Sequence, residues 1–447
     1  MDDIVLSSRE AQAKVLGSVL QACWPFLPRA ALLQWCRKHK HRWRERLWTP
    51  LVTVWACVWK QMQGGASARD VEDWIASMLG GQASGGADGH DFCAARARLP
   101  LGVFVAAVRH TGAEAVRLGG RLWRGWPVRI VDGTTLQAPR SQHNSRAFGH
   151  HRNVHGRSAL PLVRVLLQVC AGTGAVLDAV VGGAVCSEMQ LFRRLLTRLP
   201  AGELELLDRG LSSYLALWRI RERGSHALAR LHQSRQRCCA TRLGRGDELQ
   251  RWQRPKPRDV SWPDWAVEAP ESMEVRVIER QVQRKGYRTW TLRLCTTLLD
   301  PALYPADELA ALYLERWYIE LDFRTLKGEY ALERLSGKRP AVVRREVYSG
   351  LLAYNLVRAM MAETGRAVRR LSAERARMQI IEMSARMAEA PTLRLPALRR
   401  ALLVRLGHAA LAAQERPPEP RALVVTPRKF PILQGTRKQW RKQPCAA

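Results

Sequence analysis

The feature that most constrains the fold is a long helical pattern between Pro305 and Gly328. No proline or glycine interrupts it, so the sequence predicts one continuous helix. At about 100° per residue, five apolar side chains fall within roughly 60° of one another and form a core-facing stripe. These residues are Leu312, Ile319, Phe323, Leu326 and Tyr330. The helix must therefore pack this stripe against another layer of the protein.

A second row of side chains follows the same predicted helix. Measured from Tyr313, four charged residues lie within roughly an 80° arc, about 70° from the apolar stripe. They are Arg316, Glu320, Arg324 and Lys327, whereas the carboxylates of Glu315, Asp322, Glu329 and Glu333 point elsewhere. Glu320 is therefore the one acid in a row of cations at the margin of a buried core. Two interpretations stay open: a solvated face with ion pairs at four-residue spacing, which is the common case, and a functional site.

Four residues of this helix reproduce a known signature. Tyr313, then Arg316 after two residues, Glu320 after three more and Lys327 after six more match the Tyr-Arg-Glu-Lys signature of DDE transposases. The chain resembles in particular bacterial transposases of insertion sequence family four. The surrounding residues fit the same pattern: Arg316-Trp317-x-Ile319-Glu320-x-x-Phe323-Arg324-x-Leu326-Lys327. The resemblance implies that two aspartates at strand ends form a catalytic triad with Glu320.

Two aspartates upstream fit this expectation. Asp132 follows the short apolar strand predicted at residues 128–131, and Asp208 follows the one predicted at residues 204–207. Taken alone, each is more often a turn former, and Asp132-Gly133 is an ordinary turn dipeptide. Together with Glu320, and in the order of the family, they are predicted to be the three catalytic and metal-binding carboxylates.

Three carboxylates in a basic protein predict a site for hard divalent cations. Mg²⁺, or Mn²⁺ in its place, takes oxygen ligands, and two ions about 3.5–4 Å apart can clamp the attacking and leaving oxygens at phosphorus. We expect two ions with DNA bound. The resemblance implies cleavage at the ends of the element and joining of the 3′-hydroxyls to target DNA. Arg316, Lys327 and Arg324 would contact DNA phosphates, and Tyr313 would donate a hydrogen bond to one.

A tryptophan completes the set of residues that the resemblance points to. Many relatives free the element through a hairpin intermediate, and those that do carry a tryptophan in an insertion domain that receives a flipped base. Trp290, on a predicted strand, is the nearest candidate here for such a DNA contact.

The pattern of the whole chain predicts an α/β protein with six regions. Three antiparallel strands, a helix, a strand, a helix and a strand follow the order of a ribonuclease-H-like catalytic core, which a strand-rich insertion interrupts between helical N- and C-terminal regions. The second and third strands, residues 160–170 and 175–185, are expected to form a hairpin, and Ser187 and Ser212 are expected to begin the two helices. The fold name comes from the resemblance, and the element order from the sequence. The regions are a helical DNA-binding region (1–120), the first part of the core (121–231), the β-rich insertion (232–290), the second part of the core with the Glu320 helix (291–340), a helical C-terminal region (341–415) and a basic tail (416–447).

Composition narrows the partners and the compartment. Lys and Arg number 72 against 40 acidic residues, a net charge of +32, which favours a polyanion such as DNA. The sequence contains no run of about 18 apolar residues, so no membrane span is predicted. The start, Met1-Asp2-Asp3, is acidic where a signal peptide would be basic. Ten cysteines without a Cys-x-x-Cys pair are expected to be reduced thiols of a cytoplasmic protein. A homodimer is expected in the DNA complex. Residues 341–364 carry more apolar positions than one packed face needs, so the spare face either joins the partner chain or is buried against the catalytic core.

Two other functions fit parts of the sequence. A catalytically silent DNA-binding protein derived from a transposase would keep the charge and lose the acids, but all three acids are present. A stand-alone metal-dependent nuclease would need neither the insertion nor the long helical C-terminal region. Transposition is the function that uses every predicted region.

Overall fold

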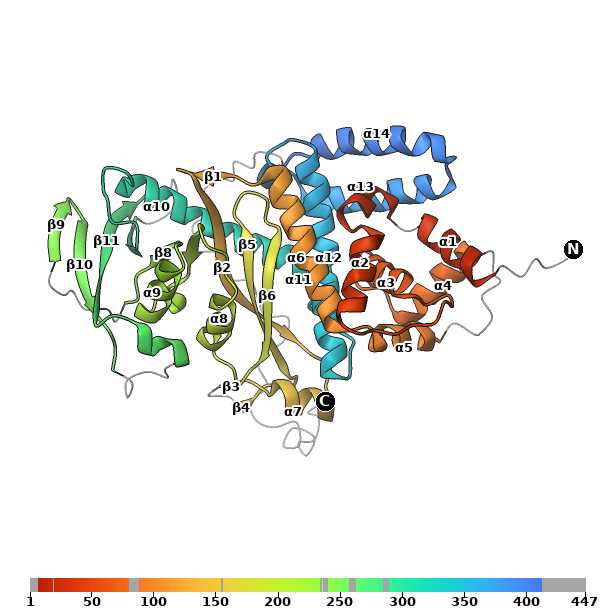
Figure 1. Ribbon diagram of the computed structural model, residues 1–447, viewed down its shortest axis with the longest axis horizontal. Coiled ribbons are helices and arrows are strands. Elements are labelled where there is room, and N and C mark those ends of the chain that lie inside the picture. The colour runs from red at the N-terminus through yellow and green to blue at the C-terminus, as the bar shows by residue number, and fades with distance from the viewer. Residues whose placement is uncertain are drawn as a thin grey trace, which may run out of the picture. The chain divides into compact units, whose positions relative to one another are not determined.

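The protein is described by a computed structural model (Figure 1), which covers residues 7–18, 20–79, 88–153, 156–233, 235, 240–256, 263–283 and 289–411. The chain divides into two compact units, residues 1–280 with 292–412 and residues 281–291 with 413–447. The elements below belong to the first unit, apart from the ends of two strands. The predicted basic tail, 416–447, lies outside the described residues.

The first unit is built on a sheet of ten strands, counted over the described residues. Nine of them are hydrogen-bonded in the order β6-β5-β2-β7-β8-β12-β11-β10-β9, and β1 pairs with β2. Strand β2 pairs antiparallel with β5, β5 antiparallel with β6, and β2 and β8 both pair parallel with β7. Its strands are β1 (Leu122–Trp123), β2 (Trp126–Gln137), β5 (Leu162–Cys170), β6 (Val176–Gly183), β7 (Leu204–Leu207), β8 (His226–Arg230), β9 (Ala240–Gly244), β10 (Asp247–Gln253), β11 (Ser272–Val282) and β12 (Trp290–Thr296). Strands β3 (Arg152–Asn153) and β4 (Gly156–Arg157) form a separate pair. The predicted α/β class is confirmed by this sheet and the helices around it.

The first strand is longer than the sequence predicts. Asp132 was expected at its end, but β2 continues to Gln137, because β5 pairs with it without a break from Arg129 onward. Gly133 and the threonines after it are therefore extended backbone and not a turn. On the other side of β2, pairing with β7 stops at Val131. Asp132 therefore lies in the middle of β2, next to the end of the shorter strand β7.

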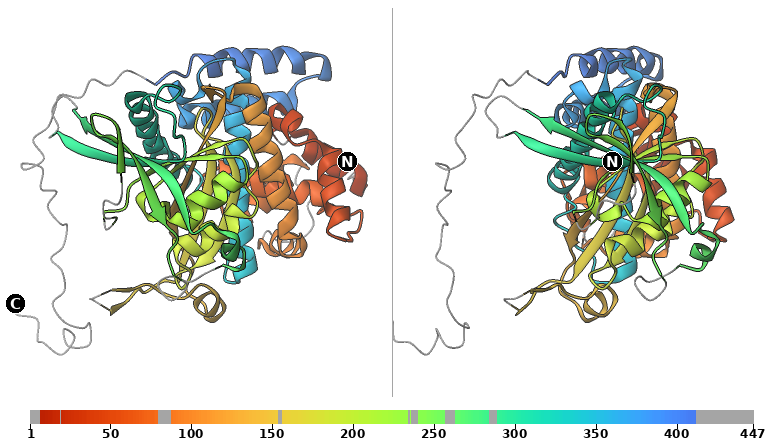
Figure 2. Two further views of the ribbon diagram at one scale, coloured as in Figure 1. Left: turned by 60° about the vertical axis from the view of Figure 1, so that its left-hand side comes forward. Right: turned by 90° about the vertical axis from the view of Figure 1, so that its left-hand side faces the viewer.

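Two long helices cover the sheet next to β6. Figures 1 and 2 show α6 (Leu101–Gly119) and α12 (Pro340–Glu363) side by side. The buried amide of Asn355 donates to the carbonyl oxygens of Val108 and Val176 and accepts from the Val176 N–H, so α12 is fixed to both α6 and β6. Residues 346–362 are all buried. The spare apolar face of residues 341–364 is therefore part of this core, since α12 has neighbours on every side.

Strands β2, β5 and β7 carry a second layer of helices. The core there joins the apolar faces of α8 (Glu188–Leu196) and α9 (Tyr214–Glu222) to β2, β5 and β7. Ser187 caps α8 as predicted, in a capping box with Gln190. Ser213 caps α9, one residue after the predicted Ser212.

The predicted insertion extends the same sheet. Strand β12 pairs antiparallel with β8, and β11, β10 and β9 follow it outward, as the green strands in Figure 2 show. The buried ion pair between Arg276 and Asp247, 2.6 Å long, joins β11 to β10. Strand-rich structure was expected for residues 232–290, and four strands lie within or at the end of that range.

Helices make up the described N- and C-terminal regions, as expected. The N-terminal ones are α1 (Ser8–Ser18), η1 (Gln21–Phe26), α2 (Arg29–Lys38), α3 (Pro50–Met62), α4 (Ala68–Met78) and α5 (His90–Arg98), and the C-terminal ones are η5 (Val368–Arg370), α13 (Ala373–Glu389), η6 (Thr392–Arg394) and α14 (Leu395–Gly407). Short helices between strands are α7 (Gln142–Phe148), η2 (Arg209–Leu211) and η3 (Asp264–Glu268). Among the described residues, no helix is long and apolar enough to cross a membrane.

The helix predicted between Pro305 and Gly328 is divided. It consists of α10 (Ala306–Leu314), a tighter turn η4 (Glu315–Trp317) and α11 (Tyr318–Gly328). Its predicted apolar stripe is confirmed, because Leu312, Ile319, Phe323, Leu326 and Tyr330 are all buried. The turn lies between the two halves of the signature, at Arg316.

Candidate active site

The register of two parallel strands places the predicted aspartates next to each other. Val131 of β2 pairs with Leu207 of β7. Asp132 and Asp208 are the next residues of these neighbouring strands, which run in the same direction at a spacing of about 4.8 Å. Strand pairing alone therefore brings together two carboxylates that are 76 positions apart in the sequence.

Arg316 joins these aspartates to the helical glutamate. Its guanidinium donates to Asp132 Oδ2 at 2.6 Å and lies 3.5 Å from Glu320 Oε1. Burial works to lower the pKa of Arg316, but Tyr313, Asp132, Asp208 and Glu320 together raise it above its usual value. Arg316 thus contacts Asp132 and lies near Glu320, and Asp208 follows the neighbouring strand. We call Asp132, Asp208 and Glu320 the acid cluster.

Burial is the main influence on the pKa of Asp132, in spite of this cation. Burial raises its pKa first of all, Arg316 and the Gly133 N–H lower it, and Asp208 raises it again, with a net rise. The Gly133 N–H donates to Asp132 Oδ1 at 2.8 Å. A carboxylate whose pKa is raised by burial and by a like charge is typical of functional sites.

Glu188, which the sequence analysis did not select, lies against the same strand. A Cβ added to Gly133 would lie 2.1 Å from Glu188 Oε1, so the carboxylate occupies the space over this glycine. Burial raises the pKa of Glu188, and Asp132 and Asp208 raise it further. The sequence did contain a signal: Glu188 is the first residue of the helix that precedes the Asp208 strand.

Tyr313 is bound differently from what the sequence predicts. The side chain was expected to face a DNA phosphate, but it is 5% exposed and its hydroxyl donates to the carbonyl oxygen of Leu207 at 3.1 Å. Its ring centroid is 6.0 Å from the Arg316 guanidinium carbon. Burial raises the pKa of this phenol well above its usual value. Tyr313 therefore connects α10 to the strand that carries Asp208.

The other predicted DNA contacts are placed as follows. Arg324 is exposed and Lys327 is half-buried on α11, and within the described part of the chain neither has a carboxylate within 4.0 Å. Trp290 is the first residue of β12 and belongs to the second unit, and it is 37% exposed.

The chemistry of the cluster suits a hard divalent cation. All its donors are carboxylate oxygens, the ligands that Mg²⁺ and Mn²⁺ prefer. Among the described residues, however, no three His, Cys, Asp or Glu side chains stand close enough to hold one ion. Arg316 occupies Asp132 and approaches Glu320 instead. The donor set fits the metal, and the guanidinium now supplies the positive charge that the acids require.

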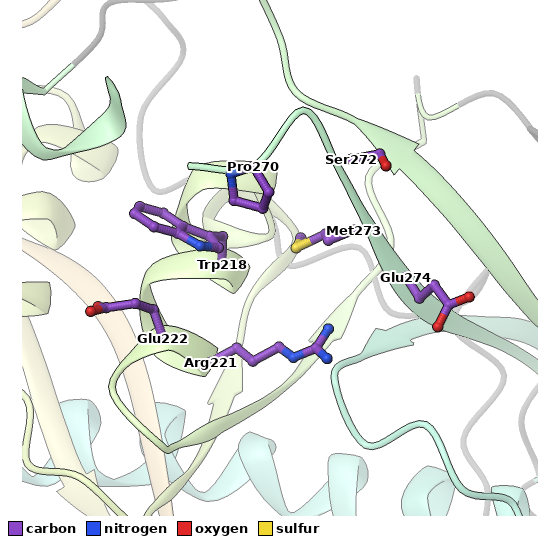
Figure 3. A pocket seen from close by; sticks show the side chains of 7 residues that line it. All are labelled: Trp218, Arg221, Glu222, Pro270, Ser272, Met273 and Glu274. Atoms are coloured by element: carbon purple, nitrogen blue, oxygen red, sulfur yellow. The ribbon is translucent and has the colours of Figure 1, made fainter. Parts of the chain in front are cut away.

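Two cavities, each of about 480 Å³, lie apart from the cluster. The first is between α9 and the segment that leads into β11 (Figure 3), and none of the predicted site residues lines it. The second contains part of the basic run of the N-terminal region. Its lining residues include Arg42, Arg44, Arg46, Arg98, His41, Trp43 and Trp48. Burial and the Arg98 charge lower the pKa of His41.

The chain is similar in sequence to known transposases. The model of a family described as "Transposase DDE domain" matches residues 123–356. The chain is 28% identical over 243 residues to "Transposase InsG for insertion sequence element IS4" of Escherichia coli (strain K12), a match that covers 54% of this chain and 53% of that one. It thus spans about half the length of this curated relative. A solved structure titled "Cryo-EM structure of piggyBac transposase synaptic complex with hairpin DNA" is 11% identical, with a TM-score of 0.41 over 89% of this chain and 86% of that one.

Proposed function

The chain belongs to the family of transposase DDE domains, and on that premise we propose that it binds the ends of an insertion sequence, cleaves them and joins the 3′-hydroxyls to target DNA. The observation that supports the proposal is geometric: within the matched residues, Arg316 is bound to Asp132 and lies 3.5 Å from Glu320, and Asp208 follows the strand that pairs with the Asp132 strand. Half of the chain is matched by the family, so the activity of the whole protein is inferred from this site.

The acid cluster is proposed to hold two Mg²⁺ or Mn²⁺ ions when DNA is bound. Bound ions would supply the Lewis-acid charge that activates an attacking oxygen and stabilises a leaving one. Asp132 and Asp208 provide oxygens from the rigid sheet, and Glu320 provides them from α11. The chain's part in the chemistry is to fix these oxygens before substrate arrives.

Cations on the same helix are proposed to position the scissile strand. A guanidinium has five N–H donors, so Arg316 can contact a phosphate while it remains near Glu320. Arg324 and Lys327 have no carboxylate within 4.0 Å among the described residues and are available for phosphate oxygens. Trp290 keeps its proposed role as a contact for DNA bases.

The regions around the site take supporting roles in this proposal. Strands β2, β5, β6, β7 and β8 with α8 and α9 would form a ribonuclease-H-like core, and residues 232–290 the insertion. The basic cavity of the N-terminal region supports DNA binding there, because arginines next to tryptophans can bind both phosphates and bases. None of Arg42, Arg44, Arg46 and Arg98 has a carboxylate within 4.0 Å in the described structure.

The experiment is cleavage and joining of DNA that carries the ends of the element, with and without Mg²⁺ or Mn²⁺. Asp132→Ala, Asp208→Ala and Glu320→Ala should each abolish both reactions while DNA binding persists, because they remove metal ligands and little phosphate-binding charge. Asp73→Ala, which removes an exposed acid on α4, is the matched control and should react normally.

Each failure points to a specific alternative. Binding without metal-dependent cleavage by the wild type would indicate a catalytically silent DNA-binding protein. Cleavage without joining would indicate a stand-alone nuclease. Near wild-type cleavage by one of the three variants would remove that residue from the site.

A further inference from the structure

Glu188 occupies a position that its own helix does not explain. It is the first residue of α8, after the Ser187 cap. The helix dipole favours an acid there, but it does not determine which neighbouring backbone the carboxylate packs against. Glu188 is half-buried, with Oε1 packed over Gly133 so closely that any Cβ at that position would collide with it.

The strand beneath Glu188 is open toward the acid cluster. Pairing between β2 and β7 ends at Val131 and Leu207, so beyond this point nothing of β7 separates Gly133 from the backbone after Asp208. The charge environment agrees with this placement, since Asp132 and Asp208 both act on the Glu188 carboxylate. The four acids therefore share one region at the end of β7.

In the described part of the chain, no basic side chain neutralises the Glu188 carboxylate by direct contact. None of the described cationic side chains lies within 4.0 Å of its carboxylate. Arg164 lowers its pKa from a distance, but the guanidinium of Arg164 donates to the Cys186 carbonyl oxygen at 2.8 Å. Arg316 is bound to Asp132 and Glu320. A half-buried acid beside two like charges costs stability unless a cation is added.

We propose that Glu188 is a fourth carboxylate of the active site and helps Asp132 and Asp208 to hold a divalent cation. The inference rests on the proposed function, because it assumes that the acid cluster binds metal. It also assigns a reason for Gly133: only a residue without a Cβ leaves room for the Glu188 carboxylate next to Asp132.

The test measures binding of Mn²⁺ alone to the full-length protein, by electron paramagnetic resonance or calorimetry and without DNA cleavage. Glu188→Gln should weaken Mn²⁺ binding about tenfold, in the range found for groups that support a metal site. Gly133→Ala should weaken it similarly, because the methyl group displaces the carboxylate. Glu374→Gln, which removes an exposed first-turn acid of the Ser372-capped helix α13, should bind Mn²⁺ like the wild type.

The variant Asp132→Asn shows whether a negative result is specific to Glu188 or extends to the acid cluster. If Asp132→Asn weakens Mn²⁺ binding and Glu188→Gln does not, the role of Glu188 is refuted and the proposed function stands. If neither variant differs from the wild type, or the wild type binds no Mn²⁺ without DNA, the role of Glu188 is refuted, and the metal-dependent cleavage assay with end DNA decides the proposed function separately. Thermal unfolding checks the fold: metal-free Glu188→Gln should melt no lower than the wild type, and Mn²⁺ should raise its melting temperature less.

Discussion

At the scale of single residues, Arg316 has two competing sets of partners. In the free protein its guanidinium is bound to Asp132 at 2.6 Å and its side chain is 14% exposed. DNA would bring phosphates, which bind guanidinium groups in the same bidentate geometry. The ion pair connects residues 184 positions apart, so no local sequence pattern could have predicted it.

Arg316→Ala and Lys327→Ala should each reduce joining more than they reduce binding to end DNA. Arg316 contacts Asp132, and Lys327 lies about two helical turns beyond Glu320 on α11, whereas most of the 72 basic residues lie elsewhere and sustain binding. Gel-shift titration and a strand-transfer assay on the same DNA measure the two effects. Arg375→Ala, an exposed arginine of α13, is the control and should change neither. Equal losses of binding and joining would identify a general DNA-binding face instead.

At the scale of elements, Tyr313 ties α10 to β7. Tyr313→Phe should lower the free energy of unfolding by about 1 kcal/mol, the usual contribution of one buried hydrogen bond, because it removes the 3.1 Å bond to Leu207. Cleavage should fall, since Asp208 follows directly after Leu207, and the affinity for end DNA should not change. Tyr318→Phe on α11, 37% exposed, is the matched control. Weaker DNA binding by Tyr313→Phe at unchanged stability would restore the phosphate contact predicted from the sequence.

Strand β7 also carries a buried acid that makes stability depend on pH. Burial raises the pKa of Glu205 to about 8, and nearby Glu203 adds to this. The folded state therefore holds a proton that the unfolded chain releases at the ordinary carboxyl pKa, so stability should fall as pH rises from about 4.5 to about 8. Glu205→Gln should flatten this decline in thermal melts, and Glu274→Gln, an exposed acid of β11, should not. The same slope in Glu205→Gln as in the wild type would contradict the assignment.

Some elements of the fold could be predicted from the sequence and others could not. The buried stripe of α10–α11, the hairpin of β5 and β6 and the Ser187 cap followed from local periodicity and turn residues, and the structure confirms all three. The predicted end of β2 was wrong, because β5 keeps Gly133 extended. Of the two outcomes left open for the apolar face of α12, the structure shows burial, because α6 and β6 pack against this helix. The roles of the acid cluster stay predictions. Glu188 was missed because its relevance arises from packing over Gly133.

At the scale of the whole molecule, the net positive charge favours a complex with DNA. The net charge of +32 opposes close approach of two free chains, and DNA would remove this repulsion. Four exposed apolar residues, Leu314, Trp317, Tyr318 and Leu321, lie along the segment from α10 to α11. Since α12 is buried, the dimer proposed from the sequence cannot use that helix as its interface.

We predict that the working form still contains two chains and two DNA ends. An insertion sequence has two ends that must be cut and joined together, and each acid cluster serves one reacting strand, so two active sites must be held in one complex. Because the free chains repel each other, pairing should depend on DNA. Light scattering or native mass spectrometry should give one chain without DNA and a mass of two chains with two duplexes once short end DNA is added. A random duplex of equal length is the control and should not give the paired complex. A complex of one chain and one end that performs joining unaided would refute the dimer.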